Sequence, residues 1–299
     1  MDHDAALHIA FGVDANYLPP MAAAMMSIVD KNPNMKLVFH VVATGFSSAD
    51  RAKIEAFAEE KGLTICVHET DREAFQDFPD PVHLTHATYN RFLICAVLKG
   101  IATKVLYLDS DIICLGSLQE LFALEMGDKI CAVVEDFEQE KSKQLIGLSG
   151  PDPYFNAGVL YIDVEKWNAH GITQTLFNLL TEGKRKLPQK DQDALNVALE
   201  GKAFFLERKW NLFFDRYPIG PDTIFLHYAG RKPWQMWSNN YQDPRFTSAL
   251  ARTPWAAWRF TPKSRKHRNK HAQRLLAKGH LLKGLYWYFL FLRTPKKRG

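Results

Sequence analysis

The segment Lys104-Val-Leu-Tyr-Leu-Asp-Ser-Asp111 decides the fold class and the place of the functional site. Residues 105–108 are apolar and favour extended structure, which indicates a short buried strand. Asp109 and Asp111 follow at once, so the strand delivers two carboxylates at its carboxyl end. Ligands of open α/β sheets bind at this edge. Aspartates two residues apart in extended chain point the same way and can approach one hard cation.

The Asp-x-Asp pattern is a weak signal by itself. At ordinary aspartate usage, a chain of this length contains about one such pair by chance. This sequence contains three: Asp2/Asp4, Asp109/Asp111 and Asp191/Asp193. Only the position of the second pair, directly after a predicted buried strand, distinguishes it from an ordinary surface pair.

Strand patterns alternate with helix patterns along most of the chain. Further strands are expected at residues 7–13, 36–43, 63–67, 130–134, 159–162 and 224–228. A first helix is expected to begin at Pro19-Pro20. A second is expected from an N-cap at Ser47 or Ser48 to its end at Gly62, and a third over residues 87–99. This alternation predicts an α/β domain with a mostly parallel, doubly wound sheet.

Several polar positions allow both a structural and a functional interpretation. Residues 155–158, Phe-Asn-Ala-Gly, indicate a turn before a strand; turn chemistry commonly explains such small residues, and close approach to a ligand is the alternative. Asp191 fits a helix N-cap. His227 lies in an apolar run, where a satisfied core histidine is about twice as common as a ligand. Arg91 fits a solvated or salt-bridged side chain. Residues 230–234 offer backbone amides and two cationic side chains that could bind a phosphate.

The bulk composition is that of an ordinary globular protein, with 299 residues, 46% of them apolar and 24% charged. Four cysteines lie in apolar runs without a metal-binding pattern, which favours buried free thiols in a reducing compartment. The N-terminus, Met-Asp-His-Asp, has no basic start or apolar stretch of a secretion signal. These features favour a cytoplasmic protein.

The charge is divided between two regions, which predicts a domain of residues 1–243 and a basic, aromatic extension of residues 244–299. The extension has 15 of the 38 Lys and Arg residues and none of the 33 acidic ones, leaving 23 basic against 33 acidic residues before it. Its aromatic run, residues 285–292, is shorter than the ~20 residues needed to span a bilayer. Basic and aromatic residues together favour a helix lying on an anionic membrane surface.

Two other interpretations of the extension remain. It could pack on the acidic body and neutralise it. Nucleic-acid binding is disfavoured, because the basic residues are confined to the terminus and the body is acidic.

Six segments, taken together and in order, resemble the retaining glycosyltransferases of family 8, specifically the bacterial enzymes that add a hexose to the lipopolysaccharide outer core. The resemblance covers residues 7–234, and a basic, aromatic tail of similar character follows. The segments are Phe11-Gly-Val-Asp-Ala-Asn-Tyr17, Tyr89-Asn-Arg-Phe92, Lys104-Val-Leu-Tyr-Leu-Asp-Ser-Asp111, Tyr154-Phe-Asn-Ala-Gly158, Asp191-Gln-Asp193 and His227-Tyr-Ala-Gly-Arg-Lys-Pro-Trp234. No single segment is decisive, but their joint occurrence in this order is not expected by chance.

The resemblance implies a GT-A (Rossmann-like) fold, a UDP-sugar donor and a Mn²⁺ or Mg²⁺ ion. By this match Asp109, Asp111 and His227 would ligate the metal, and a set with one imidazole suits Mn²⁺ better than Mg²⁺. Gly230 and Lys232 would contact the diphosphate. The loop after His227 is one residue shorter than in the family, which leaves Arg231 as an alternative to Lys232.

The match also implies the remaining donor contacts. Asp14, Asn16 and Tyr17 would hold the uracil, with Tyr17 stacking on it. The donor sugar would be lined by Arg91, Asn156, Ala157, Asp191 and Gln192, and Ser110 is expected among the residues that bind the nucleotide sugar.

The implied reaction moves galactose or glucose from a UDP-sugar to the lipopolysaccharide outer core with retention, at the cytoplasmic face of the inner membrane. The catalytic residues would be Asp109, Asp111, Asp191 and Gln192. Retention by two inversions needs a nucleophile, but the matching residue, Gln192, is an amide; same-face attack by the acceptor hydroxyl is therefore favoured. Another glycan acceptor, or a catalytically silent relative that binds nucleotide sugars, remains an alternative.

Overall fold

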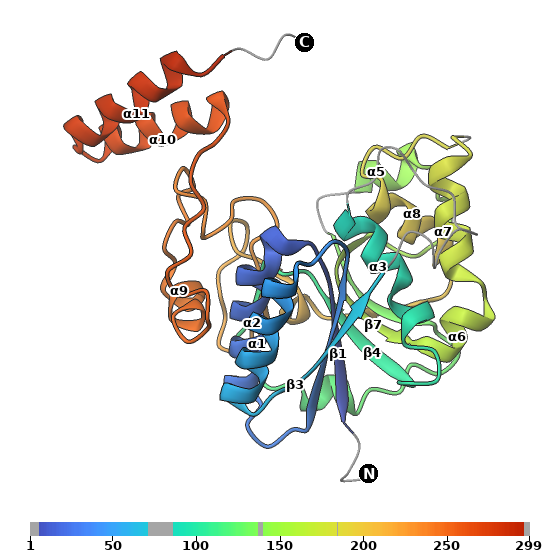
Figure 1. Ribbon diagram of the computed structural model, residues 1–299. Helices are drawn as coiled ribbons and strands as arrows, with labels where there is room; N and C mark the ends of the chain where they lie inside the picture. Colours follow the sequence, from blue (N-terminus) through green and yellow to red (C-terminus); the bar gives the residue numbers. More distant parts are fainter. Residues whose placement is uncertain (1–5, 71–85, 137–139, 184, 296–299) are drawn as a thin grey trace.

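The computed structural model describes residues 6–70, 86–136, 140–183 and 185–295 (Figure 1). Its centre is a seven-stranded sheet of strands β1 (Leu7–Val13), β2 (Leu37–Ala43), β3 (Thr64–Glu69), β4 (Lys104–Leu108), β6 (Cys131–Glu135), β7 (Phe155–Asp163) and β8 (Ala203–Leu206). A second sheet has three short strands: β5 (Ile112–Cys114), β9 (Leu212–Phe213) and β10 (Phe225–His227).

Helices cover both faces of the central sheet. The helices of the described residues are α1 (Leu18–Lys31), α2 (Ser48–Lys61), α3 (His86–Val97), α4 (Gln119–Phe122), α5 (Glu140–Leu145), α6 (Val164–Ala169), α7 (Ile172–Thr181), α8 (Asp191–Ala198), α9 (Pro244–Leu250), α10 (Arg265–Ala277) and α11 (Leu281–Arg293), of which α10 and α11 do not lie on the sheet. Helices α1 and α2 lie on one face, and α3 and α6 on the other (Figure 1). Successive residues of β1 belong to two different hydrophobic cores: Ile9 packs with α1, whereas Ala10 packs with α3. This follows because successive side chains of a strand point to opposite faces of the sheet.

The strand order is β3-β2-β1-β4-β7-β6-β8. Neighbouring strands are parallel except at β7, which runs antiparallel to both β4 and β6. The predicted α/β class with a mostly parallel sheet is therefore confirmed. The carboxyl end of β4 lies next to the amino-terminal half of β7, and this reversal brings residues 155–158 to the edge where Asp109 emerges.

Local signals placed the ends of α2 correctly. Ser47 accepts a hydrogen bond from the Asp50 amide, and the Asp50 carboxylate accepts one from the Ser47 amide, which completes a capping box. Gly62 ends the helix in the left-handed region, with φ of 63°.

The predicted turn at residues 155–158 is wrong, because these residues already belong to strand β7. The reason for a glycine is tertiary: a Cβ at Gly158 would lie 2.4 Å from Cε1 of His227. Close approach of another residue's ring, rather than a turn, requires the small residue here.

Three histidines form a hydrogen-bonded row across β1, β2 and β3. His40 Nε2 lies 2.9 Å from His8 Nδ1, and His40 Nδ1 lies 2.9 Å from His68 Nε2. His40 is 1% exposed. Its burial, followed by the neighbouring imidazoles, lowers its pKa to about 4 from the usual 6.5.

We expect the free energy of unfolding to fall as the pH drops from 6.5 towards 4. The unfolded chain takes up a proton at His40 in this window and the folded chain does not, so full stability is present above pH 6.5. His40 would account for about 1–3 kcal/mol of the loss. Urea unfolding at several pH values should show a flatter profile for His40→Gln, but an unchanged slope for His170→Gln, an exposed control. Equal slopes for wild type and His40→Gln would contradict this assignment.

The C-terminal region consists of two parts. Residues 244–260 pack on the body: Phe246 and Trp255 join the core of α1 and α2, and Arg252 forms an ion pair with Asp30. Helices α10 and α11 then form an antiparallel hairpin that extends away from the central sheet (Figure 1). The division of function at residues 243/244 stays a prediction.

The hairpin is closely packed where Gly284 of α11 meets α10, since a Cβ there would lie 2.6 Å from the Leu276 side chain. Trp287 contacts His271 edge-on, and His271 Nδ1 is bonded to the Met236 carbonyl, which ties the hairpin to the body. Within the described residues, none of the helices has both the length and the apolar character needed to cross a bilayer.

Candidate functional site

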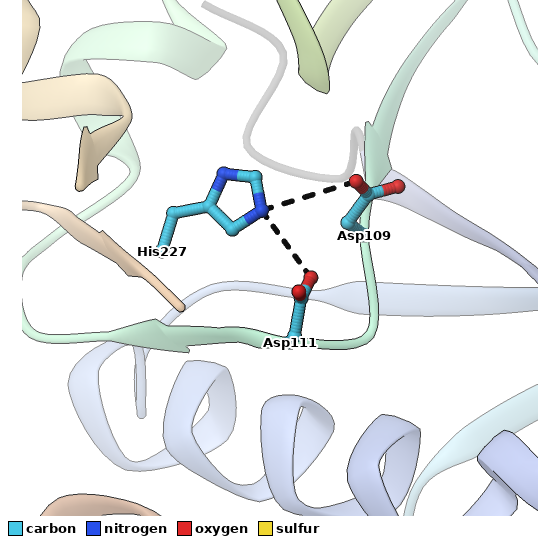
Figure 2. A group of neighbouring side chains, drawn as sticks. All are labelled: Asp109, Asp111 and His227. Carbon is cyan, nitrogen blue, oxygen red and sulfur yellow. Dashed lines mark ion pairs between the residues drawn. The ribbon is translucent and has the colours of Figure 1, made fainter. Parts of the chain in front are cut away.

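Three side chains that were predicted to share one ion lie together at the edge of the two sheets. Asp109 follows β4, Asp111 precedes β5, and His227 ends β10 (Figure 2). Strand β10 pairs antiparallel with β5, and the Tyr228 amide donates to the Asp111 carbonyl at 3.0 Å, which fixes His227 beside Asp111. His227 Nε2 lies 3.3 Å from Asp111 Oδ1 and 3.9 Å from Asp109 Oδ2.

This cluster has the chemistry of a divalent-metal site. One ligand atom from each of Asp109, Asp111 and His227 lies within 4.8 Å of the others. His227 Nδ1 is bonded to Asn211 Oδ1 at 2.8 Å, so Nε2 is the nitrogen that faces the two carboxylates. Two carboxylate oxygens and one imidazole nitrogen form a mixed set that suits Mn²⁺.

Lys232 lies at the other side of Asp111. Its ammonium forms an ion pair with Asp111 Oδ2 and donates to the carbonyls of Tyr228, at 2.8 Å, and Ala229, at 3.1 Å. Burial alone would raise the pKa of the Asp111 carboxyl, but Lys232 and His227 outweigh it and hold that pKa well below its usual range. Asp111 is therefore a permanent anion at neutral pH, able to bind a cation.

Arg91 connects the two acidic segments of the site. Its guanidinium donates to Asp109 at 2.5 Å and to Asp191 at 2.7 Å, and it lies over the Tyr107 ring. Burial would lower the pKa of Arg91, but the two aspartates, with Tyr107, raise it further above its usual value. Arg91 is thus salt-bridged, as predicted for a structural role, but its two ion pairs join Asp109 and Asp191 within the candidate site.

The interpretation of Asp191 as a helix N-cap is wrong. Helix α8 begins with Asp191 itself, and the residue before it, Lys190, makes no side-chain cap. The Asp193 carboxylate instead accepts from the Gln189 amide at 2.6 Å, and Asp191 is left to bind Arg91.

Gln192 is held with its amide in one orientation. Its Oε1 accepts from Asn156 Nδ2 at 2.9 Å and from the Ala157 amide at 3.1 Å, and its Nε2 donates to Gln189 Oε1 at 3.1 Å. Two fixed donors on the oxygen reduce its electron density, which makes the amide a still poorer nucleophile.

A cavity of about 810 Å³ contains most of the predicted residues. Its lining includes Arg91, Asp109, Asp111, Asn156, Ala157, Asp191, Gln192, His227, Gly230, Arg231 and Lys232. The other predicted residues, Asp14, Asn16, Tyr17 and Ser110, are outside this lining. Asp14 caps the short helix Ala15–Tyr17 by accepting from the Asn16 amide, and Tyr17 is 41% exposed beside Trp234.

The cavity also has polar walls that sequence reasoning did not assign. They include Asp136, Gln189, Asp215 and Arg216. Asp136 directly follows β6, the same signal that singled out Asp109 after β4, and could have been found that way. Its burial raises its pKa above the usual value. Asp215 and Arg216 follow β9, a strand of two residues that is too short to detect by periodicity.

Comparisons with known proteins identify a family and several relatives. The model of glycosyl transferase family 8 matches residues 8–238. The chain is 32% identical to lipopolysaccharide 1,3-galactosyltransferase of Salmonella typhimurium, over 96% of this chain and 90% of the relative. It is 30% identical to lipopolysaccharide 1,2-glucosyltransferase of Escherichia coli K12, over 83% and 79%. Among solved structures, galactosyltransferase LgtC, in complex with donor and acceptor sugar analogues, superposes with a TM-score of 0.70 at 27% identity, covering 88% of this chain and 100% of LgtC.

Proposed function

The chain belongs to glycosyl transferase family 8, and we propose that it transfers galactose or glucose from a UDP-sugar to the lipopolysaccharide outer core with retention of configuration. Its GT-A fold, expected from the sequence, is confirmed by the likeness to LgtC. The observation that best supports the proposal is the cluster of Asp109, Asp111 and His227 in the wall of a cavity large enough for a nucleotide sugar. The relatives' names support a hexose and a lipopolysaccharide acceptor.

Asp109, Asp111 and His227 would hold a Mn²⁺ ion, or Mg²⁺, between them. When bound, such an ion supplies positive charge that stabilises the UDP leaving group. Lys232 is placed to add to this charge, because its ammonium already lies at Asp111 and is oriented by two backbone carbonyls. We therefore assign the diphosphate contact to Lys232, with Gly230, rather than to the exposed side chain of Arg231.

The sugar end of the donor would lie against Asp191, Gln192, Asn156, Ala157 and Arg91. Arg91 orients the Asp191 carboxylate for a sugar hydroxyl, and Gln192 is fixed with its oxygen already bonded to two donors. Since an amide in this state is a poor nucleophile, we favour attack by the acceptor hydroxyl on the face that the UDP leaves. The departing phosphate oxygen would accept the hydroxyl proton.

The function is tested by hydrolysis and transfer assays on a panel of UDP-sugars. With Mn²⁺ present, UDP-galactose or UDP-glucose should be hydrolysed slowly in the absence of acceptor, and faster transfer should occur to a truncated lipopolysaccharide core. Chelation of the metal should remove both activities. Tight binding of UDP-sugars without any turnover on lipopolysaccharide or other glycans would instead identify a silent nucleotide-sugar-binding protein.

We further propose that the α10–α11 hairpin binds the anionic cytoplasmic surface of the inner membrane. One side of α11 faces away from α10 and exposes apolar side chains: Leu281, Leu282, Leu285, Tyr286, Tyr288, Phe289 and Leu292. Four exposed lysines lie on the same hairpin, Lys266, Lys270, Lys278 and Lys283, and Lys263, also exposed, lies just before α10. Because no acidic residue follows Asp243, nothing on the hairpin opposes attraction to anionic lipid.

The replacements Leu282→Asp and Phe289→Asp together should weaken binding to phosphatidylglycerol vesicles at least about 10²-fold. Both side chains would lose burial in the interface, at about 1.5–3 kcal/mol each. Vesicle co-sedimentation measures the effect. The matched control is Ile101→Asp with Leu145→Asp, two exposed apolar residues of the body. Deletion of residues 263–299 should abolish binding, and undiminished binding of that truncated chain would refute the membrane assignment.

A further inference from the structure

We infer that Asn211 is a positioning residue that fixes which nitrogen of His227 faces the metal site and couples this ring, through Asn156, to Gln192 in the sugar pocket. The inference rests on the proposed metal-dependent transfer and adds a residue that touches neither metal nor sugar. It follows from one continuous chain of hydrogen bonds whose direction is set by two backbone amides.

The first fixed point is the Gly158 amide, which lies 2.9 Å from Asn156 Oδ1. A backbone N–H can only donate, so the Asn156 atom that it meets must be the oxygen. The other end of that side chain, Nδ2, then donates to Gln192 Oε1 at 2.9 Å. The Ala157 amide also donates to this Gln192 atom, at 3.1 Å, which independently identifies the atom as the oxygen of the Gln192 side chain.

The direction of the remaining bonds follows from the Asn156 oxygen. Asn211 lies 2.8 Å from Asn156 Oδ1 and must present its NH₂ group there. Its own oxygen is consequently turned towards His227 Nδ1, also at 2.8 Å. An oxygen can only accept, so Nδ1 carries a proton, and the Nε2 lone pair is available to a cation between Asp109 and Asp111.

The packing around the ring leaves no substitute for Asn211. His227 is 2% exposed and Asn211 3% exposed, so bulk water does not replace a lost bond at either side chain. One side of the ring is closed by Gly158, where even a methyl group would come within 2.4 Å. Phe213 contacts it edge-on with 5.5 Å between centroids. Removing the Asn211 amide would leave Nδ1 of the buried His227 ring without the partner that it has in the wild type.

The test compares three variants of the full-length protein: Asn211→Ala, Asn211→Asp and the control Asn32→Ala. Asn32, directly after α1, is also a buried asparagine, 4% exposed, with bonds to the Ile28 carbonyl and the Leu118 amide. The readouts are the Mn²⁺ dissociation constant with saturating UDP, the KM for the UDP-sugar, and ¹⁵N NMR of the His227 ring without metal.

Asn211→Ala should weaken Mn²⁺ binding about 10–100-fold, the usual effect of losing the partner of a metal-binding histidine. Asn211→Asp retains an oxygen for the Nδ1 proton, so Mn²⁺ affinity should stay within about threefold of wild type. The second carboxylate oxygen would face Asn156 Oδ1, and two acceptors repel each other. Because Asn156 also holds Gln192 in the sugar pocket, the KM for the UDP-sugar should rise. Asn32→Ala should lower stability without changing either constant.

The NMR readout tests the direction of the chain without any metal. Wild type should show a protonated Nδ1, and Asn211→Ala should move the proton towards Nε2, where Asp111 then offers the nearest acceptor at 3.3 Å. An unprotonated Nδ1 in wild type would overturn the inference, as would equal Mn²⁺ affinity of Asn211→Ala and wild type. Wild type that takes no Mn²⁺ would count against the proposed function instead, while the NMR result still decides the role of Asn211.

Discussion

Asp111→Asn should abolish sugar transfer, with a fall in kcat of at least about 10²–10³-fold, while the fold persists. The change removes one anionic ligand of the candidate metal cluster and the charge partner of Lys232. Folding should survive because asparagine has the same shape and Lys232 keeps its bonds to the carbonyls of Tyr228 and Ala229. Transfer assays over a range of Mn²⁺ concentrations and far-UV circular dichroism measure the two properties.

The matched control for this prediction is Asp128→Asn, which makes the same chemical change at an exposed position. It should leave activity and stability unchanged. Partial rescue of Asp111→Asn by high Mn²⁺ would agree with a weakened metal site. Full activity of Asp111→Asn at ordinary Mn²⁺ would overturn the metal assignment, because the carboxylate next to His227 would then be dispensable.

Arg91→Met should both destabilise the protein and remove most of its activity. The Arg91 side chain is 12% exposed, and its positive charge is paired with the carboxylates of Asp109 and Asp191, which are 26% and 24% exposed. Its loss leaves two carboxylates near each other in a partly buried site. We expect a cost of about 2–3 kcal/mol, below the roughly 3–5 kcal/mol for fully buried pairs. Urea unfolding measures the stability, and kcat with the UDP-sugar should fall about 10²-fold or more, since Asp109 and Asp191 lose their orientation.

Two comparison variants separate geometry from charge in this prediction. Arg91→Lys keeps the positive charge but lacks the planar guanidinium that bonds both aspartates at once. Its free energy of unfolding should therefore lie between those of Arg91→Met and wild type, while its activity stays low. Arg252→Met removes the arginine of the ion pair with Asp30, whose partners are 42% and 37% exposed, and should cost less than about 1 kcal/mol. Arg91→Met with wild-type activity would show that the bridge has no part in catalysis.

Features that depend on neighbouring residues in the sequence were predicted well. Strand β1 has the bounds expected from its apolar run, and α2 begins and ends at its capping residues. The emergence of Asp109 and Asp111 from the end of a buried strand also followed from a local pattern. These features are set by periodicity and backbone preference, whose physical range is one turn or a few strand residues.

Features that depend on distant partners were missed or misread. Residues 155–158 form part of a strand because they pair with β6 and bond to Asp109, whereas the need for Gly158 comes from the His227 ring, which a later strand supplies. The N-cap interpretation of Asp191 failed because the partner of its carboxylate is Arg91, on α3. Asn211 gave no signal, since one asparagine before a two-residue strand has no pattern of its own.

The amino-acid order alone was sufficient for the α/β class, for the carboxylates at the strand end, and for the family through six ordered segments. The reversed β7, the Arg91 bridge and the Asn211–His227 bond needed the folded chain, because each joins groups remote in sequence. Local preferences decide which element forms, whereas the partner of a polar side chain is decided by which elements pack together. In this protein that packing places an imidazole beside two carboxylates.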